Sequence, residues 1–502
     1  MKLNKVKNFF TGASVDSLFL IMVRVVTLVL GMLMTRLLSG HFSLHEYGTY
    51  SQVLLLTSTV SSLTILGMMD GINFFFSRER NTEKRNAYVS TIFFLQYIAS
   101  AIASAIVLSC AIPISNYFEN IDLKKLIVFA AILPILQNAI SLLQIMFVAI
   151  GKAKIIAFRN LAVSIAKLIA ITLACYVFNS IIVLLAAQVL LDLAQAVYFA
   201  VSLQRNNCKI SVFSCDKKLI KEILVYCVPM AMFSMIKSLN RDVDKFVISF
   251  FTNTETLAVY TNASKLLPFD IVMTSFCTVL LPYITCYFSE NRRDYAKKLY
   301  RSFLELSYTV TTILAGGAIC IAPELMRFLY TETYTSYEYG ITVFVIYITV
   351  DIFSVMNMTM VLSAAGKTKT IMLASIGIFF VNVALDIGLY FVLQEVGPAF
   401  ATLVVTMIQG LILFSLTAKE LGTNLLGILD CRNLCIFIAE LVLVFFVSLT
   451  IRYFMLKVGF QYVLILFVVY VFFCGTMFLL NYKKIFENLK KINQSKLLQT
   501  TL

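Results

Sequence analysis

The sequence is poor in the residues from which soluble enzymes build active sites. Only 14% of its 502 residues are charged, it has 2 histidines, and none of its 11 cysteines forms a Cys-x-x-Cys pair. His41 and His45 lie four residues apart beside Glu46, which are too few ligands for a zinc site. We find no glycine-rich phosphate loop and no Ser/His/Asp arrangement. These absences argue against a metal centre, a bound cofactor and an enzyme.

Apolar residues, by contrast, are abundant: they make up 60% of the chain, and the mean hydropathy is +0.88. No soluble domain has this balance, and about 20 apolar residues suffice to cross a bilayer as a helix. About fourteen such runs lie between residues 15 and 481, and the longest hydrophilic stretches are too short to bury a core. The sequence therefore predicts an all-α polytopic membrane protein with about fourteen transmembrane helices.

The basic residues predict how the chain is oriented. With the N-terminus inside, the inner segments hold 29 lysines and arginines, the outer loops hold 5, and 7 lie within the spans. Such an excess is typical of the cytoplasmic side, so both termini are predicted to be cytoplasmic. The net charge of +14 is then explained by anionic lipid headgroups, and nucleic acid is not an expected partner.

The chain also repeats itself. Gly151-Lys152-Ala153-Lys154 and Gly366-Lys367-Thr368-Lys369 open the fifth and eleventh runs at an offset of 215 residues. Tyr50 and Tyr260 end similar short segments at the second and eighth runs, 210 residues apart. Six spans return a chain to its starting side, so two six-helix halves with a pseudo-two-fold axis along the membrane normal are expected.

From this repeat we predict the following parts. They are an N-terminal segment (1–14), a first six-helix bundle (15–203), a linker (204–223), a second bundle (224–418), two additional helices (434–481) and a tail (482–502).

The most informative stretch is 229–251, because this run of spanning length contains five charged residues. An i, i+4, i+7, i+8 spacing places four of them on one helical face: Lys237, Arg241, Asp244 and Lys245. A charge near the bilayer centre costs about 2.5 to 3.5 kcal/mol, so it requires a reason. A cationic face predicts a water-filled cavity that receives an anion. The alternative is a structural salt bridge of Asp244 with Lys245 or with another helix.

Other spans carry charge as well. The basic residues that we predict to bind an anionic substrate are Arg24, Lys167, Lys237, Arg241 and Lys265. The carboxylates that could titrate or bind sodium to couple transport are Asp192, Asp351 and Asp386. Each carboxylate could instead neutralise one of the cations. Uncharged polar stripes on the same spans are explained by hydrogen bonds between helices.

Two groups of residues carry a family resemblance. The first is Thr35-Arg36-Leu37-Leu38 followed by Glu46-Tyr47-Gly48-Thr49-Tyr50, and the second is Asp244-Lys245 followed by Val259-Tyr260-Thr261-Asn262-Ala263-Ser264-Lys265. This pattern resembles the polysaccharide-transporter (Wzx-like) branch of the multidrug/oligosaccharidyl-lipid/polysaccharide exporter superfamily over nearly the whole chain. One departure is Ala258, where the family has glycine.

The resemblance implies two six-helix bundles around a central cavity that opens alternately to either side. It implies a flippase that exports an undecaprenyl-pyrophosphate-linked oligosaccharide across the bacterial cytoplasmic membrane for surface polysaccharide such as O-antigen or capsule. It carries the cavity role to Arg24, Lys237, Arg241 and Lys265. Membrane lipids and other polysaccharide-assembly proteins are further expected partners.

Three alternatives remain open at this point. A cation-coupled multidrug antiporter of the same fold would favour an acidic cavity, whereas the predicted one is basic. A lipid II flippase is the second alternative, and it is closer than the antiporter to the flippase that the resemblance implies. A membrane-embedded glycan polymerase would need a sizeable outer loop, and the longest one, residues 324–339, is short.

Overall fold

A computed structural model describes residues 12–65, 67–78, 81–149, 153–205, 215–265, 267, 269 and 271–500. Within these ranges every regular element is a helix. Nine of the described helical segments are long and apolar enough to cross a membrane, or ten if one bent pair counts as a span. One of the nine, Lys369–Glu420, itself contains two helices. The all-α polytopic prediction is confirmed, and the count of fourteen spans stays a prediction.

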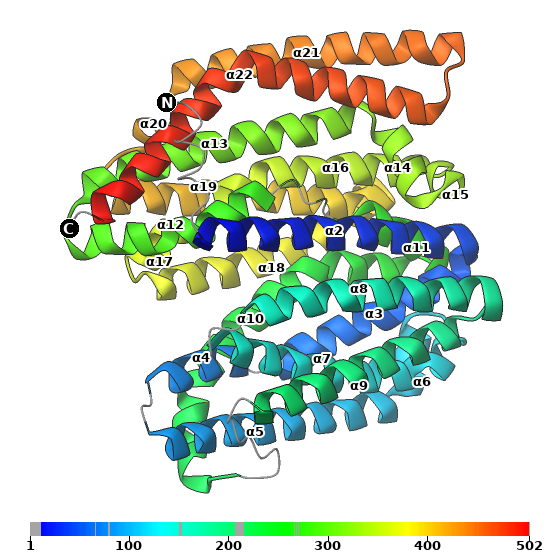
Figure 1. Ribbon diagram of the computed structural model, residues 1–502. Helices are drawn as coiled ribbons and strands as arrows, with labels where there is room; N and C mark the ends of the chain where they lie inside the picture. The colour runs from blue at the N-terminus through cyan, green and yellow to red at the C-terminus, as the bar shows by residue number, and fades with distance from the viewer. Residues whose placement is uncertain are drawn as a thin grey trace. The chain divides into compact units, whose positions relative to one another are not determined.

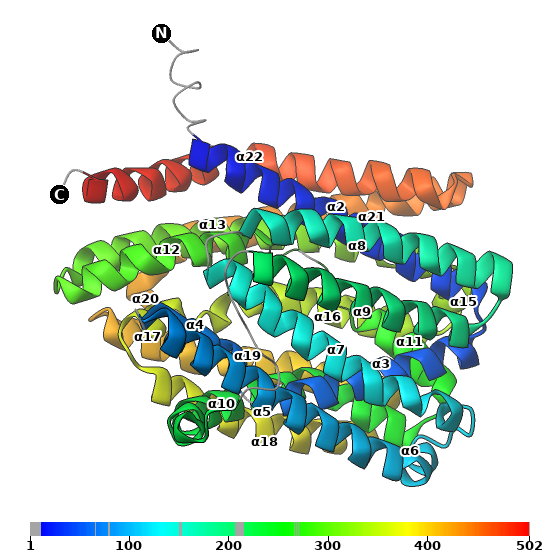
Figure 2. The ribbon, with the colours of Figure 1, turned by 60° about the horizontal axis from the view of Figure 1, so that its bottom comes forward.

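The chain divides into two compact units, and unit 1 consists of Met1–Asp242 and Ser249–Ala258. Its helices are α2 (Gly12–His41), α3 (Leu44–Thr64), α4 (Met68–Arg78), α5 (Thr82–Ser109), α6 (Ala111–Tyr117), α7 (Leu123–Ala149), α8 (Ala153–Leu173), α9 (Ile181–Arg205) and most of α10 (Lys217–Phe251). A π-helical turn, Ala174–Phe178, follows α8. Helix α7 packs on α3, α5 and α9 (Figure 2), and α2 packs on α8.

Unit 2 consists of Val243–Ile248 and Val259–Leu502. Its helices are α11 (Thr254–Ala263, from Val259), α12 (Ile271–Ser289), α13 (Arg293–Cys320), α14 (Ala322–Tyr330), α15 (Glu332–Thr335), α16 (Glu338–Ser354), α17 (Met360–Ala364), α18 (Thr368–Leu393), α19 (Gly397–Glu420), α20 (Leu425–Ile428), α21 (Cys431–Val458) and α22 (Tyr462–Thr500). Helix α18 packs on α19, and α22 packs on both α13 and α21 (Figure 1).

Long apolar runs become helices here because a helix satisfies its own backbone hydrogen bonds, as lipid requires. Local signals then decide where the helices begin. Ser43 caps α3 in a capping box: its hydroxyl accepts from the Glu46 amide at 3.2 Å, and the Glu46 carboxylate accepts from the Ser43 amide at 3.0 Å. Asn81 caps α5, and the Asp430 carboxylate caps α21.

The second apolar run of each predicted half forms two helices. Helices α3 and α4 are separated at residues 65–67, and α11 and α12 at residues 264–270. The long apolar run 257–288 is therefore not one straight helix. The second helix of each pair provides buried apolar side chains, Met68 and Ile72 in unit 1 and Leu280 and Ile284 in unit 2.

Each unit buries its own apolar core. In unit 1, Phe93, Phe147 and Phe199 are buried together with Ile223 and Cys227 of α10. The first half of α10 thus packs with the helices before it, whereas the predicted second bundle began at residue 224. The predicted bounds of the parts stay predictions.

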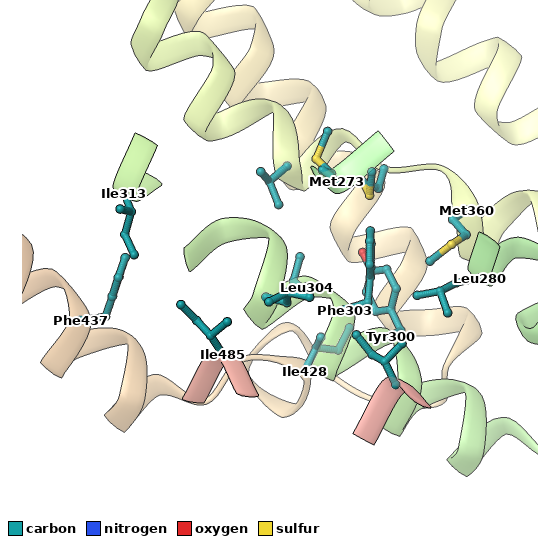
Figure 3. Packing of buried hydrophobic residues seen from close by; sticks show 14 of the residues in the cluster. Met273, Leu280, Tyr300, Phe303, Leu304, Ile313, Met360, Ile428, Phe437 and Ile485 are labelled. Atoms are coloured by element: carbon teal, nitrogen blue, oxygen red, sulfur yellow. The ribbon is translucent and has the colours of Figure 1, made fainter. Parts of the chain in front are cut away.

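In unit 2, the largest buried cluster joins α12 and α13 to α21 and α22. Figure 3 shows Tyr300, Phe303 and Leu304 of α13 beside Ile428 and Ile485. This cluster fixes α22 against α13 over most of its apolar length. The nine cysteines for which the structure describes a bonding state are all free thiols.

Candidate functional site

Three of the five predicted substrate-binding cations have described side chains. Arg24 lies in α2 and Lys237 in α10, and both of their side chains lie outside the described residues. Arg241 lies in α10 with 62% of its side chain exposed. Its guanidinium contacts the Asp242 carboxylate at 3.4 Å and the Ser238 hydroxyl at 3.3 Å. The sequence predicts that α10 crosses the membrane; an exposed arginine on such a helix must face water or an anion, because lipid cannot solvate it.

In unit 1, the structure brings together two of the predicted residues. The Lys167 amine of α8 lies 3.8 Å from the carboxylate of Asp192 on α9, which is buried. Gln195 donates a hydrogen bond to the same carboxylate at 3.0 Å. Asp192 is therefore held by a cation and an amide. This is the arrangement that we listed as the alternative to a coupling role for this carboxylate.

A third charged residue of this group was missed. Arg159 lies two turns inside α8, although we counted it with an inner loop, and it is 92% buried, with an exposed fraction of 8%. It donates to the Gln195 amide oxygen, and its guanidinium carbon lies 4.6 Å from the Phe199 ring centroid. Among the described residues, its Nε and Nη2 have no hydrogen-bond partner. The group of Arg159, Lys167 and Asp192 thus carries two positive charges and one negative charge.

In unit 2, Lys265 follows the last turn of α11. Its amine bonds the Asn262 amide oxygen at 3.1 Å and lies 5.9 Å from the ring centroid of Tyr330. It also interacts electrostatically with Lys245. Lys245 and Lys265, which both belong to the second group of residues that carries the family resemblance, are therefore neighbours within this unit.

The carboxylates of unit 2 form the most unusual arrangement. Asp244 of α10 and Asp386 of α18 are almost completely buried, with exposed fractions of 2% and 0%, and they repel each other electrostatically. The Tyr347 hydroxyl of α16 donates to Asp244 and also interacts with Thr402 of α19. Neither carboxylate oxygen of Asp386 has a hydrogen-bond partner among the described residues. We call Asp244, Tyr347, Asp386 and Thr402 the carboxylate cluster.

Two carboxylates in one buried site require compensation. An ionised carboxylate taken out of water without a partner costs several kcal/mol, and a second one nearby adds repulsion. A proton or a monovalent cation is the simplest neutralising group, and hydroxyl and carboxylate oxygens suit a hard cation. Asp351 lies one turn after Tyr347 on α16 and is also buried, with its backbone carbonyl accepting from Ser354 at 2.7 Å.

With this geometry in view, we compared the chain with known proteins. The model of a family described as "Polysaccharide biosynthesis protein" matches residues 33–339, which is more than half of the chain. The chain belongs to this family. The family predicted from the sequence motifs is thereby confirmed.

Related proteins agree at the level of the fold. "Probable lipid II flippase MurJ" of Rickettsia prowazekii (strain Madrid E) is 21% identical over 355 residues, which are 66% of this chain and 68% of the relative. The structure titled "Lipid II flippase MurJ, inward closed conformation" covers 92% of this chain and 99% of its own, with a TM-score of 0.72 and 18% identity. An inward-facing multidrug resistance MATE family transporter of the MOP superfamily covers 79% and 94%, with a TM-score of 0.61 and 12% identity.

Within the matched region, the Glu46–Tyr50 motif of this polysaccharide biosynthesis protein has a structural role. Glu46 completes the α3 cap, and Gly48 lies so close to α11 that a Cβ atom there would come within 2.2 Å of the Thr254 carbonyl oxygen. Gln52 donates to the Thr254 hydroxyl at 3.2 Å, and Asn120 donates to Gln52 at 2.7 Å. The motif thus specifies a close helix contact inside unit 1.

Glu324, in the segment 324–339, has a structural partner. Glu324 of α14 is buried, and the Arg452 Nε of α21 donates to both of its carboxylate oxygens, at 2.9 and 3.0 Å. This pair joins the short helix α14 to α21.

Proposed function

We propose that this polysaccharide biosynthesis protein is a flippase that exports an undecaprenyl-pyrophosphate-linked oligosaccharide by alternating access. We place it in the bacterial cytoplasmic membrane with both termini on the cytoplasmic side, in a pathway for surface polysaccharide. The family and the shared fold with flippases and transporters support a lipid-linked substrate. Other polysaccharide-assembly proteins would deliver the substrate and use the product.

The observation that carries the proposal is the exposed Arg241 side chain on α10, the helix that the sequence predicts to cross the membrane. A diphosphate that crosses the membrane needs replacements for its lost water, and arginine offers a planar, permanently charged fork for phosphate oxygens. Arg159 and Lys167 outnumber their single carboxylate, Asp192, which favours an anionic substrate over the organic cations of a drug antiporter. Lys237, Lys265 and Arg24 are proposed as further ligands.

Substitutions at Arg241 test this role. Arg241→Lys should retain part of the export, because a point charge survives, whereas Arg241→Ala should lose most of it and Arg241→Glu all of it. Surface glycan and the amount of protein in the membrane are measured together. Lys218→Glu is the matched control, because Lys218 is an exposed lysine in the first turn of the same helix.

The competing explanation is a structural ion pair with Asp242, which is buried. In that case Arg241→Ala would remove an ion-pair partner of the buried Asp242 carboxylate, the protein level would fall, and Asp242→Asn would restore it. Normal protein level with normal surface glycan in Arg241→Glu would refute the substrate-binding role.

The proposal also assigns a coupling ion to the carboxylate cluster. Asp386 was predicted as a coupling carboxylate, and its pairing with Asp244 supports a site that one proton or one sodium ion occupies. Binding and release of that ion would change the charge between α10 and α18 within unit 2. Such a change can bias the helix positions that a transport cycle needs. Asp192, with two cations beside it, is the weaker candidate.

The lipid II flippase remains the second candidate, because a protein of that name and a solved structure of that title share the fold. Export assays with the two lipid-linked substrates in the same vesicles distinguish the candidates. Transport of lipid II alone would correct the substrate and would leave the flippase function intact.

A further inference from the structure

A second polar site lies in unit 2, away from the carboxylate cluster. A cavity of about 640 Å³ is enclosed by the first turns of α13, the start of α21 and the last part of α22. It extends along α13 from Lys298 to Thr309, which corresponds to about 16 Å at the rise of an α-helix. This volume is within the range of small-molecule sites.

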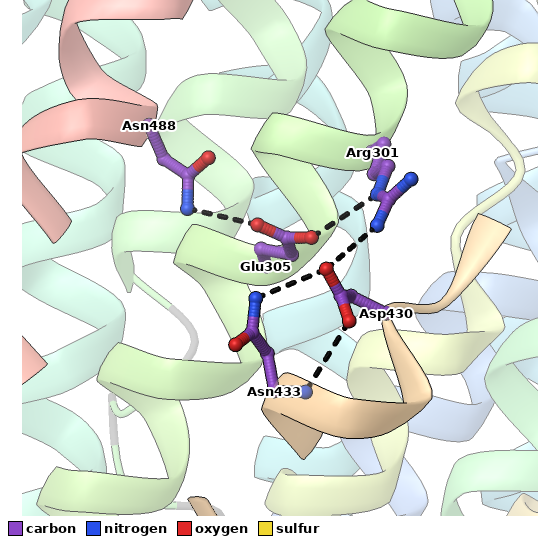
Figure 4. Close-up of polar contacts among 5 residues, drawn as sticks. All are labelled: Arg301, Glu305, Asp430, Asn433 and Asn488. Carbon is purple, nitrogen blue, oxygen red and sulfur yellow. Dashed lines mark hydrogen bonds and ion pairs between the residues drawn. The ribbon is translucent and has the colours of Figure 1, made fainter. Parts of the chain in front are cut away.

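A chain of ion pairs and hydrogen bonds lies along one wall of the cavity (Figure 4). Arg301 bonds Glu305 at 3.2 Å and Asp430 at 3.0 Å, and Asn433 donates to Asp430 at 3.0 Å. Asn488 of α22 donates to Glu305 at 3.1 Å. The charge of Arg301 is therefore already compensated, and these residues tie the polar ends of α13, α21 and α22 together.

Three lysines of the cavity have no such compensation. Lys298, Lys484 and Lys491 line it and form no ion pair among the described residues, and Glu487 is the one remaining acidic lining residue without an ion pair there. The lining thus keeps an excess of positive charge. Lys298, Lys484 and Lys491 also belong to the segments whose lysines and arginines gave the predicted cytoplasmic side.

A second observation indicates what the ligand must offer. Asn488 is 95% buried, with an exposed fraction of 5%, and it lines the cavity. Its amide oxygen has no hydrogen-bond partner among the described residues. A buried carbonyl oxygen of this kind accepts from a hydroxyl or an N–H group, so a ligand with both phosphate and hydroxyl groups fits better than phosphate alone.

The surroundings point to lipid as the source. Helix α22 changes from apolar to charged residues just before Lys483, and apolar side chains on its other faces, such as Leu479 and Phe486, are exposed. Ile485, by contrast, is buried in the core of unit 2 (Figure 3). The cavity thus lies at the level where a membrane helix meets lipid headgroups, and basic pockets between helices at this level bind anionic headgroups.

We propose that this cavity binds the headgroup of an anionic glycerophospholipid of the phosphatidylglycerol type. Its phosphate is held by Lys298, Lys484 and Lys491, and a headgroup hydroxyl donates to the Asn488 amide oxygen. The bound lipid fastens the ends of α21 and α22 to α13. The site is separate from the proposed transport residues, so its test does not depend on the flippase function.

Native mass spectrometry of the full-length protein in detergent tests the site. Phosphatidylglycerol is titrated, with phosphatidic acid, phosphatidylcholine and free glycerol phosphate as comparisons. We expect phosphatidylglycerol to bind more tightly than the other three. Lys484→Gln and Lys491→Gln should each weaken its binding about fivefold, as expected for one basic residue near a headgroup.

Lys483→Gln/Lys490→Gln is the matched control, because both lysines are exposed on the same helix and neither lines the cavity. It should leave phosphatidylglycerol binding within about twofold of the original protein. If the control and Lys484→Gln/Lys491→Gln lose the same amount of phosphatidylglycerol binding, the lysines attract the lipid only as general surface charge. That result would refute the proposed site. If free glycerol phosphate binds equally tightly, the ligand need not be a lipid, and that part of the proposal is refuted. If phosphatidic acid binds more tightly, the proposed contact between a headgroup hydroxyl and Asn488 is refuted.

Discussion

If the carboxylate cluster binds a cation, then the stability of the protein must depend on that cation. The sharpest perturbation is Asp386→Asn, which keeps the shape of a fully buried side chain and removes one of two repelling charges. A ligand that binds only the folded state stabilises it by about 2.7 kcal/mol at one hundred times its Kd. Above the Kd, each tenfold rise in concentration adds about 1.4 kcal/mol.

The assay is unfolding of the purified protein in detergent at constant ionic strength, with sodium replacing choline. The original protein should gain about 1.4 kcal/mol per tenfold sodium, and Asp386→Asn should show a flat response. At low sodium Asp386→Asn should be the more stable protein, because its repulsion with Asp244 is gone. Asp122→Asn is the control, since Asp122 is an exposed acidic residue.

Three outcomes would identify the coupling ion or refute the reasoning. If a proton is the ligand, stability rises as the pH falls and sodium has no effect, because the folded state then binds more protons than the unfolded state. If Asp386→Asn keeps the full sodium dependence, the ion binds elsewhere. If neither sodium nor pH changes the stability of the original protein, the carboxylate cluster has no exchangeable ligand.

Three further predictions concern the structure itself. Gly48→Ala should destabilise the protein by about 1 to 3 kcal/mol, measured by unfolding in detergent, because its Cβ would overlap the Thr254 carbonyl; Gly31→Ala, with no neighbouring atom within 4 Å, should have little effect. Arg452→Met should cost about 3 to 5 kcal/mol by stranding the Glu324 carboxylate, and adding Glu324→Met should recover most of that loss in the same assay. For topology, single cysteines at Asn81 and Asn207 should resist an impermeant external thiol reagent and one at Thr335 should react, with reversed labelling contradicting the predicted orientation. A cysteine at the exposed Glu255 should react as well, whereas the neighbouring Thr254 is unsuitable because it is buried against Gln52. Asn207 lies outside the described residues.

The helical architecture could be predicted from the sequence because lipid leaves few alternatives. Long apolar runs must form helices, and the charges inside them stand out against their background. Asp386 was visible as a charge within an apolar run of spanning length. Family membership was visible too, because Glu46 and Gly48 belong to a short motif that serves a helix cap and a close helix contact.

The pairing between helices could not be predicted in the same way. Periodicity tells which face of a helix a residue occupies, and it does not tell which other helix meets that face. Our alternative paired Asp244 with Lys245 or with another helix and could not say which helix, whereas the structure gives Tyr347 of α16, 103 residues away, as its hydroxyl donor. Arg159 was missed because a charge near the end of an apolar run is usually solvated, and here Gln195 and Phe199 of α9 bury it instead.

The described acidic residues of unit 2 fall into two classes, those with a bonding partner from the chain itself and those, like Asp386, whose carboxylate oxygens have no hydrogen-bond partner there. This difference supports a functional role for Asp386. Arg452 bonds both oxygens of Glu324, and Arg301 bonds Glu305 and Asp430, so these buried or half-buried acids have partners from the chain itself. Asp386 is more deeply buried than any of them, and among the described residues neither of its oxygens has a hydrogen-bond partner. A purely structural carboxylate in that position would destabilise the fold by several kcal/mol, and leucine or asparagine would serve better. The site is therefore best explained by a partner that comes from solution, and a transport protein has a use for such a partner in coupling.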